Sequence, residues 1–378
     1  MYCRVLKFIY GLAEASKQFY DKLNKTFLSM GYKASIADPC LYIKRYKEGL
    51  HMICCHVDDI FSVSPSEAVS KYFENKLGKV FELKTQAGST LNYLGMVIKS
   101  HNNGDITVSQ QAYVTELTDK YLSKTSQSRP VSTPADISLL SHNDQYNISL
   151  SAKDTTEYKG LVMSLMYLAR MTRPDILMPT TYLATRCSQP TQNDMIKARR
   201  VLKYLHSTQG YALVYQGNAE MQLKVYADAS HLLHEDGYGH TGIVAMLGPN
   251  LIMTKSSKQK LVARSSSEAE LIAAEDASTF VPYLRRICFE LDLIQKGPTQ
   301  LFQDNQSSVL IAVQGSGSFK RTKHMIGRYA YLKERVDKKD IVLSYLSTKE
   351  MIADMMTKPL GRPLLTSHVS SIGMRRLR

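Results

Sequence analysis

The sequence of 378 residues contains no tryptophan, although it has 23 tyrosines and 10 phenylalanines. No stretch approaches the roughly 18 consecutive apolar residues that a membrane span needs, so we do not expect a transmembrane protein. The first residues lack a long apolar run beside a small-residue cleavage site, which argues against secretion. Hydrophobic residues form 44% and charged residues 22% of the chain, values that exclude a wholly disordered or collagen-like protein.

Cysteine is also scarce, with six residues that are widely separated apart from the adjacent Cys54 and Cys55. This spacing excludes the paired cysteine motifs that hold structural zinc. We interpret these cysteines as buried thiols of a protein in a reducing compartment.

Basic residues outnumber acidic ones, and the formal net charge is +14. From Lys320 to Arg378 there are 14 basic and 5 acidic residues. Such an excess favours a polyanionic partner, nucleic acid above all, although a solvated basic surface explains it equally well. Arg375, Arg376 and Arg378 look like a disordered basic tail.

The spacing of apolar residues predicts mixed helices and strands in residues 1–125. We expect helices over 14–30, 66–77 and 110–122, and strands over 41–46, 52–63 and 105–108. Pro130 and Pro134 then lie among many Ser, Thr, Asn and Asp residues, which is typical of a connector. Helical periodicity resumes over 157–170 and 192–206.

A different pattern begins at Met221. It predicts strands over 222–228, 239–247, 250–254, 300–303 and 341–346, and helices from about Ser267, over 305–313 and 325–337, and from Lys349. Strands followed by alternating helix and strand favour an α/β domain in this third block. The whole chain is therefore predicted to be multidomain, with α+β and α/β parts.

Asp58 and Asp59 are two adjacent carboxylates in an apolar stretch that runs from Ile53 to Phe61. Burying them is costly unless they are paired or bind a cation. At a hairpin bend they could hold Mg²⁺, which prefers oxygen ligands. The alternative is a solvated turn, but the apolar flanks favour the metal site.

Four further acids lie in the third block, three of them at the ends or beginnings of elements: Asp228, Glu270, Asp304 and Asp354. Each taken alone is more simply a cap, a surface acid or an ion-pair partner. Together, with strand, helix, strand and helix beneath them, they favour a two-metal nuclease.

Several ordered motifs resemble the Pol polyprotein of copia-type long-terminal-repeat retrotransposons. The family's Y-G-L, V-D-D and L-G-x-x-I segments correspond to Tyr10–Leu12, Val57–Asp59 and Leu94–Ile98. The family's T-R-P-D, S-S-T-E-A-E, D-N-Q-S and A-D-x-x-T-K-P-L segments correspond to residues 172–175, 265–270, 304–307 and 353–360. The resemblance covers nearly the whole chain, from reverse transcriptase through to ribonuclease H.

The resemblance implies a role for each acid. Asp58 and Asp59 match the palm carboxylates of the polymerase metal site. Asp228, Glu270, Asp304 and Asp354 match the four acids of ribonuclease H. Glu270 is preferred over Glu268 because an apolar helix follows it, whereas Glu268 would cap the helix or meet its dipole. The implied cofactor is Mg²⁺, with Mn²⁺ as the other candidate.

The resemblance also divides the chain. Residues 1–125 would be an incomplete reverse transcriptase palm and thumb, 126–220 a linker and connection region, 221–365 a ribonuclease H-like domain, and 366–378 a basic tail. A third palm Asp would lie upstream of Met1, so we do not expect the chain alone to polymerise DNA. The alternative is a catalytically inactive, truncated or domesticated copy that only binds nucleic acid.

The expected partners are an RNA–DNA hybrid, a primer-template and the remaining Pol domains, namely integrase and upstream reverse transcriptase, with no membrane. The expected location is the cytoplasm, in virus-like particles, with import into the nucleus also open. Candidate nucleic-acid contacts are the primer-holding Leu94 and Gly95, and the basic-surface residues Lys255, Lys258, Lys260, Arg321, Lys323 and His324.

The missing tryptophan is explained by the same resemblance. Phe19, His231, Met253 and Tyr283 occupy positions where the family usually has Trp. Phe19 and Tyr283 keep an aromatic ring, whereas the other two do not. The absence therefore indicates a divergent member rather than another fold class.

Overall fold

The computed structural model describes residues 14–122, 130–140, 146–306 and 325–377. These residues form two compact units. The first contains the residues up to Gly88 together with Tyr283–Ile294, and the second contains Ser89–Pro282 and Gln295–Arg378. Helix α8 (Ser266–Glu290) contributes to both units, with the division falling after Pro282. Among the described residues, no helix is long and apolar enough to cross a bilayer.

The first unit pairs a four-stranded sheet, in the order β1-β2-β3-β4, with two amphipathic helices. Its elements are α1 (Ala15–Ser29), β1 (Lys33–Ala34), β2 (Leu41–Tyr46), β3 (Gly49–His56), β4 (Asp59–Val63) and α2 (Glu67–Leu77). Phe27 of α1, Tyr42 and Ile53 of the sheet, and Phe73 of α2 meet in one apolar cluster. Ser66 caps α2 by accepting a hydrogen bond from the Val69 amide at 3.4 Å.

The stretch 52–63 is not one strand, as the apolar run predicts, but the hairpin of β3 and β4. Val57 has a φ of 56°, in the left-handed region, and begins the turn. His56 pairs with Asp59, so Asp58 lies in the turn and Asp59 opens β4. The sequence did not reveal the turn, because both strands of the hairpin are apolar and the turn between them is only two residues long.

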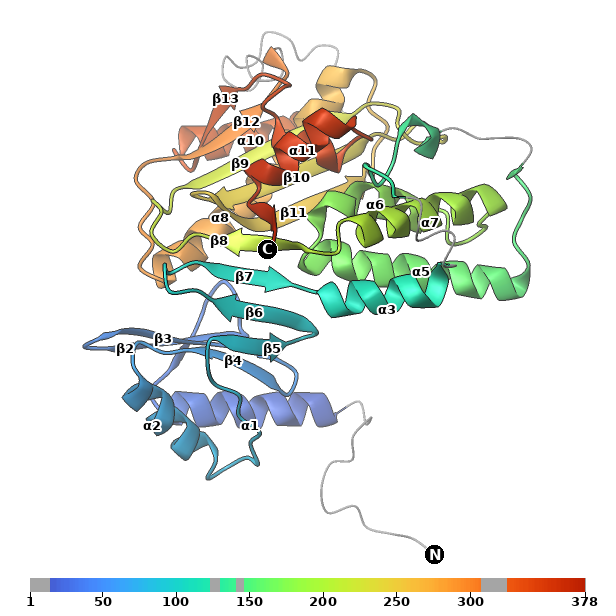
Figure 1. Ribbon diagram of the computed structural model, residues 1–378. Coiled ribbons are helices and arrows are strands. Elements are labelled where there is room, and N and C mark those ends of the chain that lie inside the picture. Colours follow the sequence, from blue (N-terminus) through green and yellow to red (C-terminus); the bar gives the residue numbers. More distant parts are fainter. Residues whose placement is uncertain (1–13, 123–129, 141–145, 307–324, 378) are drawn as a thin grey trace, which may run out of the picture. The chain divides into compact units, whose positions relative to one another are not determined.

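The second unit contains two five-stranded sheets (Figure 1). One has the order β14-β8-β7-β6-β5 and is antiparallel throughout. Its strands are β5 (Thr90–Tyr93), β6 (Met96–Ser100), β7 (Ile106–Ser109), β8 (Tyr211–Tyr215) and β14 (Met374–Arg376). The predicted disordered tail is therefore wrong for Arg375 and Arg376, because they pair with Ala212 and Tyr211.

The other sheet of this unit has the order β11-β10-β9-β12-β13. Its strands are β9 (Leu223–Ser230), β10 (His240–Leu247), β11 (Asn250–Lys258), β12 (Thr299–Gln303) and β13 (Ile341–Tyr345). The first three are antiparallel, whereas β12 runs parallel to both β9 and β13. Parallel neighbours need crossover connections, and helices α8 and α10 (Ile326–Asp337) lie within those connections.

Helices from the middle of the chain pack beside this sheet through one continuous core. They are α3 (Gln111–Tyr121), α5 (Ala152–Met171), α6 (Leu177–Ala184) and α7 (Gln192–Ser207), followed near the end of the chain by the 3₁₀ helix η6 (Ile352–Met356) and α11 (Arg362–Ser371). Helix α6 contacts β11, and η6 contacts β9 and β10. The helical segment and the sheet therefore share their hydrophobic interior.

The predicted fold class is confirmed: the chain is a mixed helix and sheet protein with several sheets. Short 3₁₀ turns also occur at Ile137–Leu139 and Pro174–Ile176. The expected helix over 305–313 lies largely outside the described residues. The domain boundaries at 125, 220 and 365 stay predictions.

Candidate active site

Three carboxylates from separate elements meet at one edge of the β9–β13 sheet. Asp228 lies on β9, Asp304 directly follows β12, and Asp354 lies in η6. In the parallel pairing Phe302 stands opposite Tyr226, so Asp304 and Asp228, two residues further along, stand side by side. Their carboxylate oxygens and one from Asp354 all lie within 4.8 Å of one another. Among the described residues this is the one such group of three.

Glu270 borders this group without belonging to it. It is buried, and its Oε1 accepts a hydrogen bond of 3.3 Å from the backbone amide of Ala229, the residue after Asp228. Gln303 donates from Nε2 to the Glu270 carbonyl at 2.8 Å and to its Oε2 at 3.3 Å. Glu268 instead accepts the Arg264 amide at 2.8 Å, as a helix cap does. The structure thus turns Glu270, not Glu268, toward the carboxylates.

Two threonines hold the acids in place. Thr357 donates its hydroxyl hydrogen to Oδ2 of Asp228, and the pair is buried. Thr348, in the segment after β13, donates to Oδ2 of Asp304 at 2.8 Å. Each bond uses one oxygen of its carboxylate, so the other oxygen of each acid is left for a further partner.

Lys358 carries the positive charge nearest to the group. Its Nζ lies 3.1 Å from Oδ2 of Asp354 and 3.8 Å from Oδ2 of Asp228. Despite this ion pair, neither carboxylate oxygen of Asp354 accepts a hydrogen bond from the described residues, although the residue is only 1% exposed.

Burial is the main influence on the acidity of these groups. Together with the neighbouring carboxylates of Asp354 and Asp304, and against the charge of Lys358, it raises the pKa of Asp228 to about 7. Burial, then Asp228 and Asp304, raise the pKa of Glu270 well above its usual range. Burial likewise raises the pKa of Asp354. Several buried carboxylates that disfavour their own ionisation call for additional positive charge.

The residues fit a hard divalent cation. Mg²⁺ and Mn²⁺ take oxygen ligands, and the group supplies carboxylate oxygens only. The buried Asp354 oxygens that lack hydrogen bonds are the kind of acceptor that a cation satisfies. Asp228, Asp304 and Asp354 would hold such an ion, with Glu270 close by.

The other predicted metal site has a different character. Asp58 and Asp59 are both exposed at the β3–β4 turn. Among the described residues no third acid, histidine or cysteine completes a metal-binding group with them. Two exposed carboxylates alone are a weak cation site, because water competes for both.

Leu94 and Gly95 form the two-residue turn between β5 and β6. Both have positive φ, 47° and 67°. Tyr167 donates its hydroxyl hydrogen to the Leu94 carbonyl, and a Cβ on Gly95 would lie 2.7 Å from that hydroxyl oxygen. The close approach of Tyr167 explains why a glycine follows Leu94.

Two of the predicted basic contacts are already engaged within the chain. Lys255 pairs with Asp276 at 3.1 Å and lies over the Phe280 ring, and Lys258 pairs with Asp236. Lys260 is exposed. Three further candidates, Arg321, Lys323 and His324, lie outside the described residues. Their contact with nucleic acid stays a prediction.

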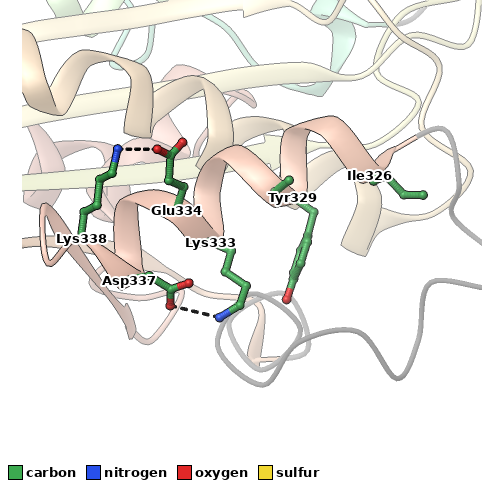
Figure 2. A pocket seen from close by; sticks show the side chains of 7 residues that line it. Ile326, Tyr329, Lys333, Glu334, Asp337 and Lys338 are labelled. Atoms are coloured by element: carbon green, nitrogen blue, oxygen red, sulfur yellow. Dashed lines mark hydrogen bonds and ion pairs between the residues drawn. The ribbon is translucent and has the colours of Figure 1, made fainter.

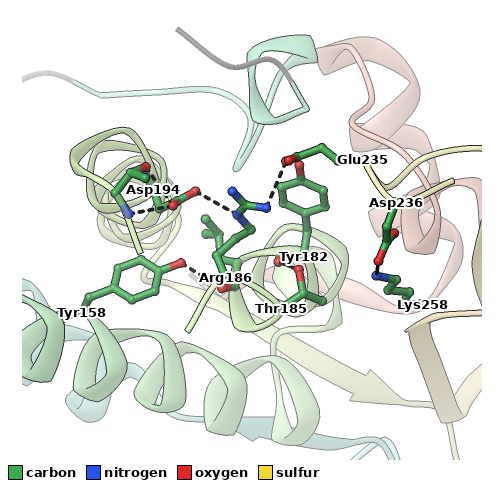
Figure 3. A network of polar contacts seen from close by, with 10 residues as sticks. Tyr158, Tyr182, Thr185, Arg186, Asp194, Glu235, Asp236 and Lys258 are labelled. Carbon is green, nitrogen blue, oxygen red and sulfur yellow. Dashed lines mark hydrogen bonds and ion pairs between the residues drawn. The ribbon is translucent and has the colours of Figure 1, made fainter. Parts of the chain in front are cut away.

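Two other features of this unit, a pocket and an ion-pair network, lie apart from the carboxylates. A pocket of about 620 Å³ runs along α10, where Lys333 pairs with Asp337 and Lys338 with Glu334 (Figure 2). Figure 3 shows Arg186, after α6, bridging Asp194 of α7 and Glu235 of the β9–β10 loop. None of the residues that line either feature belongs to the carboxylate group.

Sequence reasoning missed Lys358, Thr357, Thr348 and Gln303. Lys358 and Thr357 do fall in the T-K-P-L segment that carries part of the resemblance, which was a signal for their importance. Their partners could not be predicted, because Thr357 and Asp228 are 129 residues apart in sequence.

Comparison with known proteins places this geometry in context. The sequence model of the reverse transcriptase (RNA-dependent DNA polymerase) family matches residues 1–136. A retrovirus-related Pol polyprotein from transposon TNT 1-94 of Nicotiana tabacum is 30% identical over 368 residues, which cover 96% of this chain and 27% of that protein. A putative transposon Ty5-1 protein of Saccharomyces cerevisiae is 30% identical over 271 residues, covering 71% of this chain and 86% of that protein.

Two solved structures that match parts of the chain have TM-scores below 0.5. The N-terminal RNase H domain of rv2228c from Mycobacterium tuberculosis is 10% identical, with a TM-score of 0.28, and the match covers 40% of this chain and 98% of that one. A foamy viral protease-reverse transcriptase in complex with an RNA/DNA hybrid is 11% identical, with a TM-score of 0.41, covering 78% and 36%.

The sequence relationship is the decisive comparison. The Ty5-1 protein is matched over most of its length, whereas the chain spans 27% of the TNT 1-94 polyprotein and 25% of a related polyprotein from transposon RE1 of Arabidopsis thaliana. Within the region shared with these relatives, residues 1–136 match the reverse transcriptase family. The chain belongs to the copia-type retrotransposon Pol family.

Proposed function

We propose that the chain hydrolyses the RNA strand of RNA–DNA hybrids, leaving a 3′-hydroxyl, with two divalent cations held by Asp228, Glu270, Asp304 and Asp354. The observation that carries this proposal is the meeting of three carboxylates, within 4.8 Å, from a strand, a strand end and a 3₁₀ helix. Bound Mg²⁺ or Mn²⁺ would supply an activated water and stabilise the leaving oxygen.

The chain's own residues set up this chemistry. Thr357 and Thr348 each fix one oxygen of a carboxylate and so orient the other toward the shared centre. Gln303 and the Ala229 amide position Glu270. Ligands fixed in advance lose little entropy when an ion binds, which is what preorganised catalysis requires.

Under the same proposal, residues 1–125 would be a part of a reverse transcriptase that cannot synthesise DNA by itself. Asp58 and Asp59 would serve RNA-directed DNA synthesis only where the rest of a Pol polyprotein supplies a third acid and the fingers. Their exposure at a turn, with no third ligand among the described residues, supports that dependence. The partners would be a hybrid duplex, a primer-template and the remaining Pol domains.

A hybrid-cleavage assay tests the nuclease. The purified chain, supplied with Mg²⁺ and an RNA–DNA hybrid, should cut the RNA strand, and Asp304→Asn should lower the rate on the order of a thousandfold. Asp337→Asn, a change of the same kind at an exposed position of α10, should leave the rate unaltered.

Equal cleavage by the wild type and Asp304→Asn would refute the nuclease proposal. Hybrid binding without cleavage by the wild type would favour the alternative, an inactive copy that only binds nucleic acid. The two outcomes are separated by measuring binding and product formation on the same samples.

A further inference from the structure

Lys358 differs from the other side chains around the carboxylates because it is cationic and long. It follows η6, which carries Asp354, and its ammonium returns to the same group, 3.1 Å from Asp354 and 3.8 Å from Asp228. Both of these acids belong to the set of three that would hold a cation. A divalent ion and the ammonium would therefore neutralise the same two carboxylates and repel each other there.

The contact between Lys358 and Asp354 is electrostatic rather than directional. The ammonium lies 3.1 Å from Oδ2 of Asp354 as an ion pair, and its geometry falls short of a directional hydrogen bond to either oxygen. Thr357, by contrast, donates a hydrogen bond to Asp228 and is itself fully buried. Lys358 therefore neutralises charge at the group, whereas Thr357 fixes the orientation of one carboxylate.

The Lys358 side chain is also partly exposed to solvent, so it can move away from the carboxylates. Its side chain is 36% exposed, whereas the side chains of Asp228 and Asp354 are 2% and 1% exposed. A lysine on a flexible four-carbon stem can move its ammonium into water at little cost. The carboxylates, which are held by buried backbone, cannot follow it.

We propose that Lys358 is a resident counter-cation that neutralises the carboxylates of the ion-free chain and is displaced from them when a divalent cation binds. The inference rests on the metal site of the proposed function. Two consequences follow for this chain. The ammonium lowers the affinity for the first divalent ion, and it stabilises the fold while the site holds none.

Metal binding without substrate is the direct test. The full chain, Lys358→Met and Lys358→Arg are titrated with Mn²⁺ at one pH, and free Mn²⁺ is followed by electron paramagnetic resonance. Lys358→Met should bind Mn²⁺ about tenfold more tightly than the wild type, because no ammonium has to be displaced. Lys358→Arg keeps the charge and should bind like the wild type.

Thermal unfolding supplies a second readout. Without divalent ions Lys358→Met should melt below the wild type, and saturating Mn²⁺ should raise its melting temperature by more than it raises that of the wild type. Lys333→Met removes a lysine of α10 whose side chain is 39% exposed, similar to that of Lys358, and serves as the matched control, with no change expected in Mn²⁺ affinity.

Unchanged or weaker Mn²⁺ binding by Lys358→Met would overturn the inference, since a merely structural lysine would give that result. If Lys358→Met does not fold, Lys358→Gln takes its place with the same expected direction. Absence of Mn²⁺ binding in every variant would overturn the inference together with the metal site. Neither Mn²⁺ binding nor thermal unfolding depends on RNA cleavage, so these experiments and the hybrid-cleavage assay can fail independently.

Discussion

Arg173 is the largest side chain that the described part of the chain buries completely. Its guanidinium forms two parallel bonds with Asp175, at 3.0 and 2.8 Å, and donates to the carbonyl and hydroxyl of Thr208. The rings of Tyr204 and Tyr211 lie 5.6 Å from it. The T-R-P-D segment therefore has a structural role, that of tying the start of α6 to the end of α7.

Removing the charge of Asp175 should destabilise the protein strongly. Asp175→Asn leaves the Arg173 cation buried without a counter-charge, so the free energy of unfolding should fall by about 3–5 kcal/mol. Urea denaturation followed by circular dichroism measures this change. The exposed pair Arg199–Glu157 provides the control, because Glu157→Gln should cost less than about 1 kcal/mol. A comparable small loss for Asp175→Asn would contradict the expected role of the pair.

At the scale of elements, the closest packing in the site lies between β10 and η6. A Cβ on Gly242 would stand 2.6 Å from Cγ2 of Thr357 and 2.8 Å from the Ala353 carbonyl oxygen. Gly242 also pairs with Asp228 across the β9–β10 ladder. A bare backbone at this position is what lets η6 bring Asp354 to the strand that carries Asp228.

Gly242→Ala should therefore displace η6. We expect a loss of about 1–3 kcal/mol in unfolding free energy, and a fall of about a hundredfold in hybrid cleavage because the carboxylates shift apart. Gly327→Ala on α10, where an added Cβ meets nothing within 4 Å, is the matched control and should be slightly stabilising. Equal cleavage rates for the two variants would show that η6 tolerates the added methyl group.

The helices and strands that could be predicted from the sequence are those in which apolar residues recur at a regular spacing. Helix α7 and strand β2 lie within one residue of their expected ranges, because each buries one face only. Helix α6 was missed because Leu177, Met178, Pro179, Thr180, Tyr182 and Leu183 are all buried, and a helix buried all round has no polar face to detect. Strands β5 and β6 are only four and five residues long, and neither contains a fully buried residue, so the apolar pattern is short and weak.

The candidate site, too, was predictable from the sequence only in part. The four acids could be named from the sequence through their motifs, but their mutual distances could not. The supports contributed by Thr357 and Lys358 depend on a contact across more than a hundred residues, which no local pattern encodes.

At the scale of the whole second unit, a buried polar chain links the helices to the site. Tyr182 of α6 stacks on His234, and His234 on His240 of β10. Ser256 donates to the Met356 carbonyl of η6 at 2.8 Å, so it accepts from Nε2 of His240. Nδ1 of His240 then accepts from Nε2 of His234 at 3.0 Å. Both imidazoles are neutral in this chain of hydrogen bonds.

Stability should consequently depend on pH through these histidines. Burial lowers the pKa of His240 to about 3 and that of His234 to about 4. A group whose pKa is lower in the folded state binds protons better when unfolded, so its contribution to stability is lost as pH falls from about 6.5 toward 4. The charged groups that face His234 are Lys258, Asp236, Glu235 and Arg186.

Comparison of the wild type with His240→Gln separates the contribution of this histidine from that of other titrating groups. The raised pKa of Asp228 acts in the opposite sense and favours the folded state as pH falls. We therefore expect His240→Gln to be less stable than the wild type at pH 7.5, with the difference between the two shrinking toward pH 4.5. Urea denaturation at several pH values measures that difference. A constant difference across the range would exclude a titrating His240.

The positions of η6 and β14 in the sequence determine when they are synthesised relative to the other elements. The ribosome makes Asp228, Glu270 and Asp304 before it makes Asp354, and strand β14 adds the edge of its sheet later still. A nascent chain that has folded its earlier strands still lacks one acid and has not yet received Lys358. The carboxylate group is therefore completed late in synthesis, and a polypeptide whose translation stops before η6 would hold Asp228, Glu270 and Asp304 without Asp354.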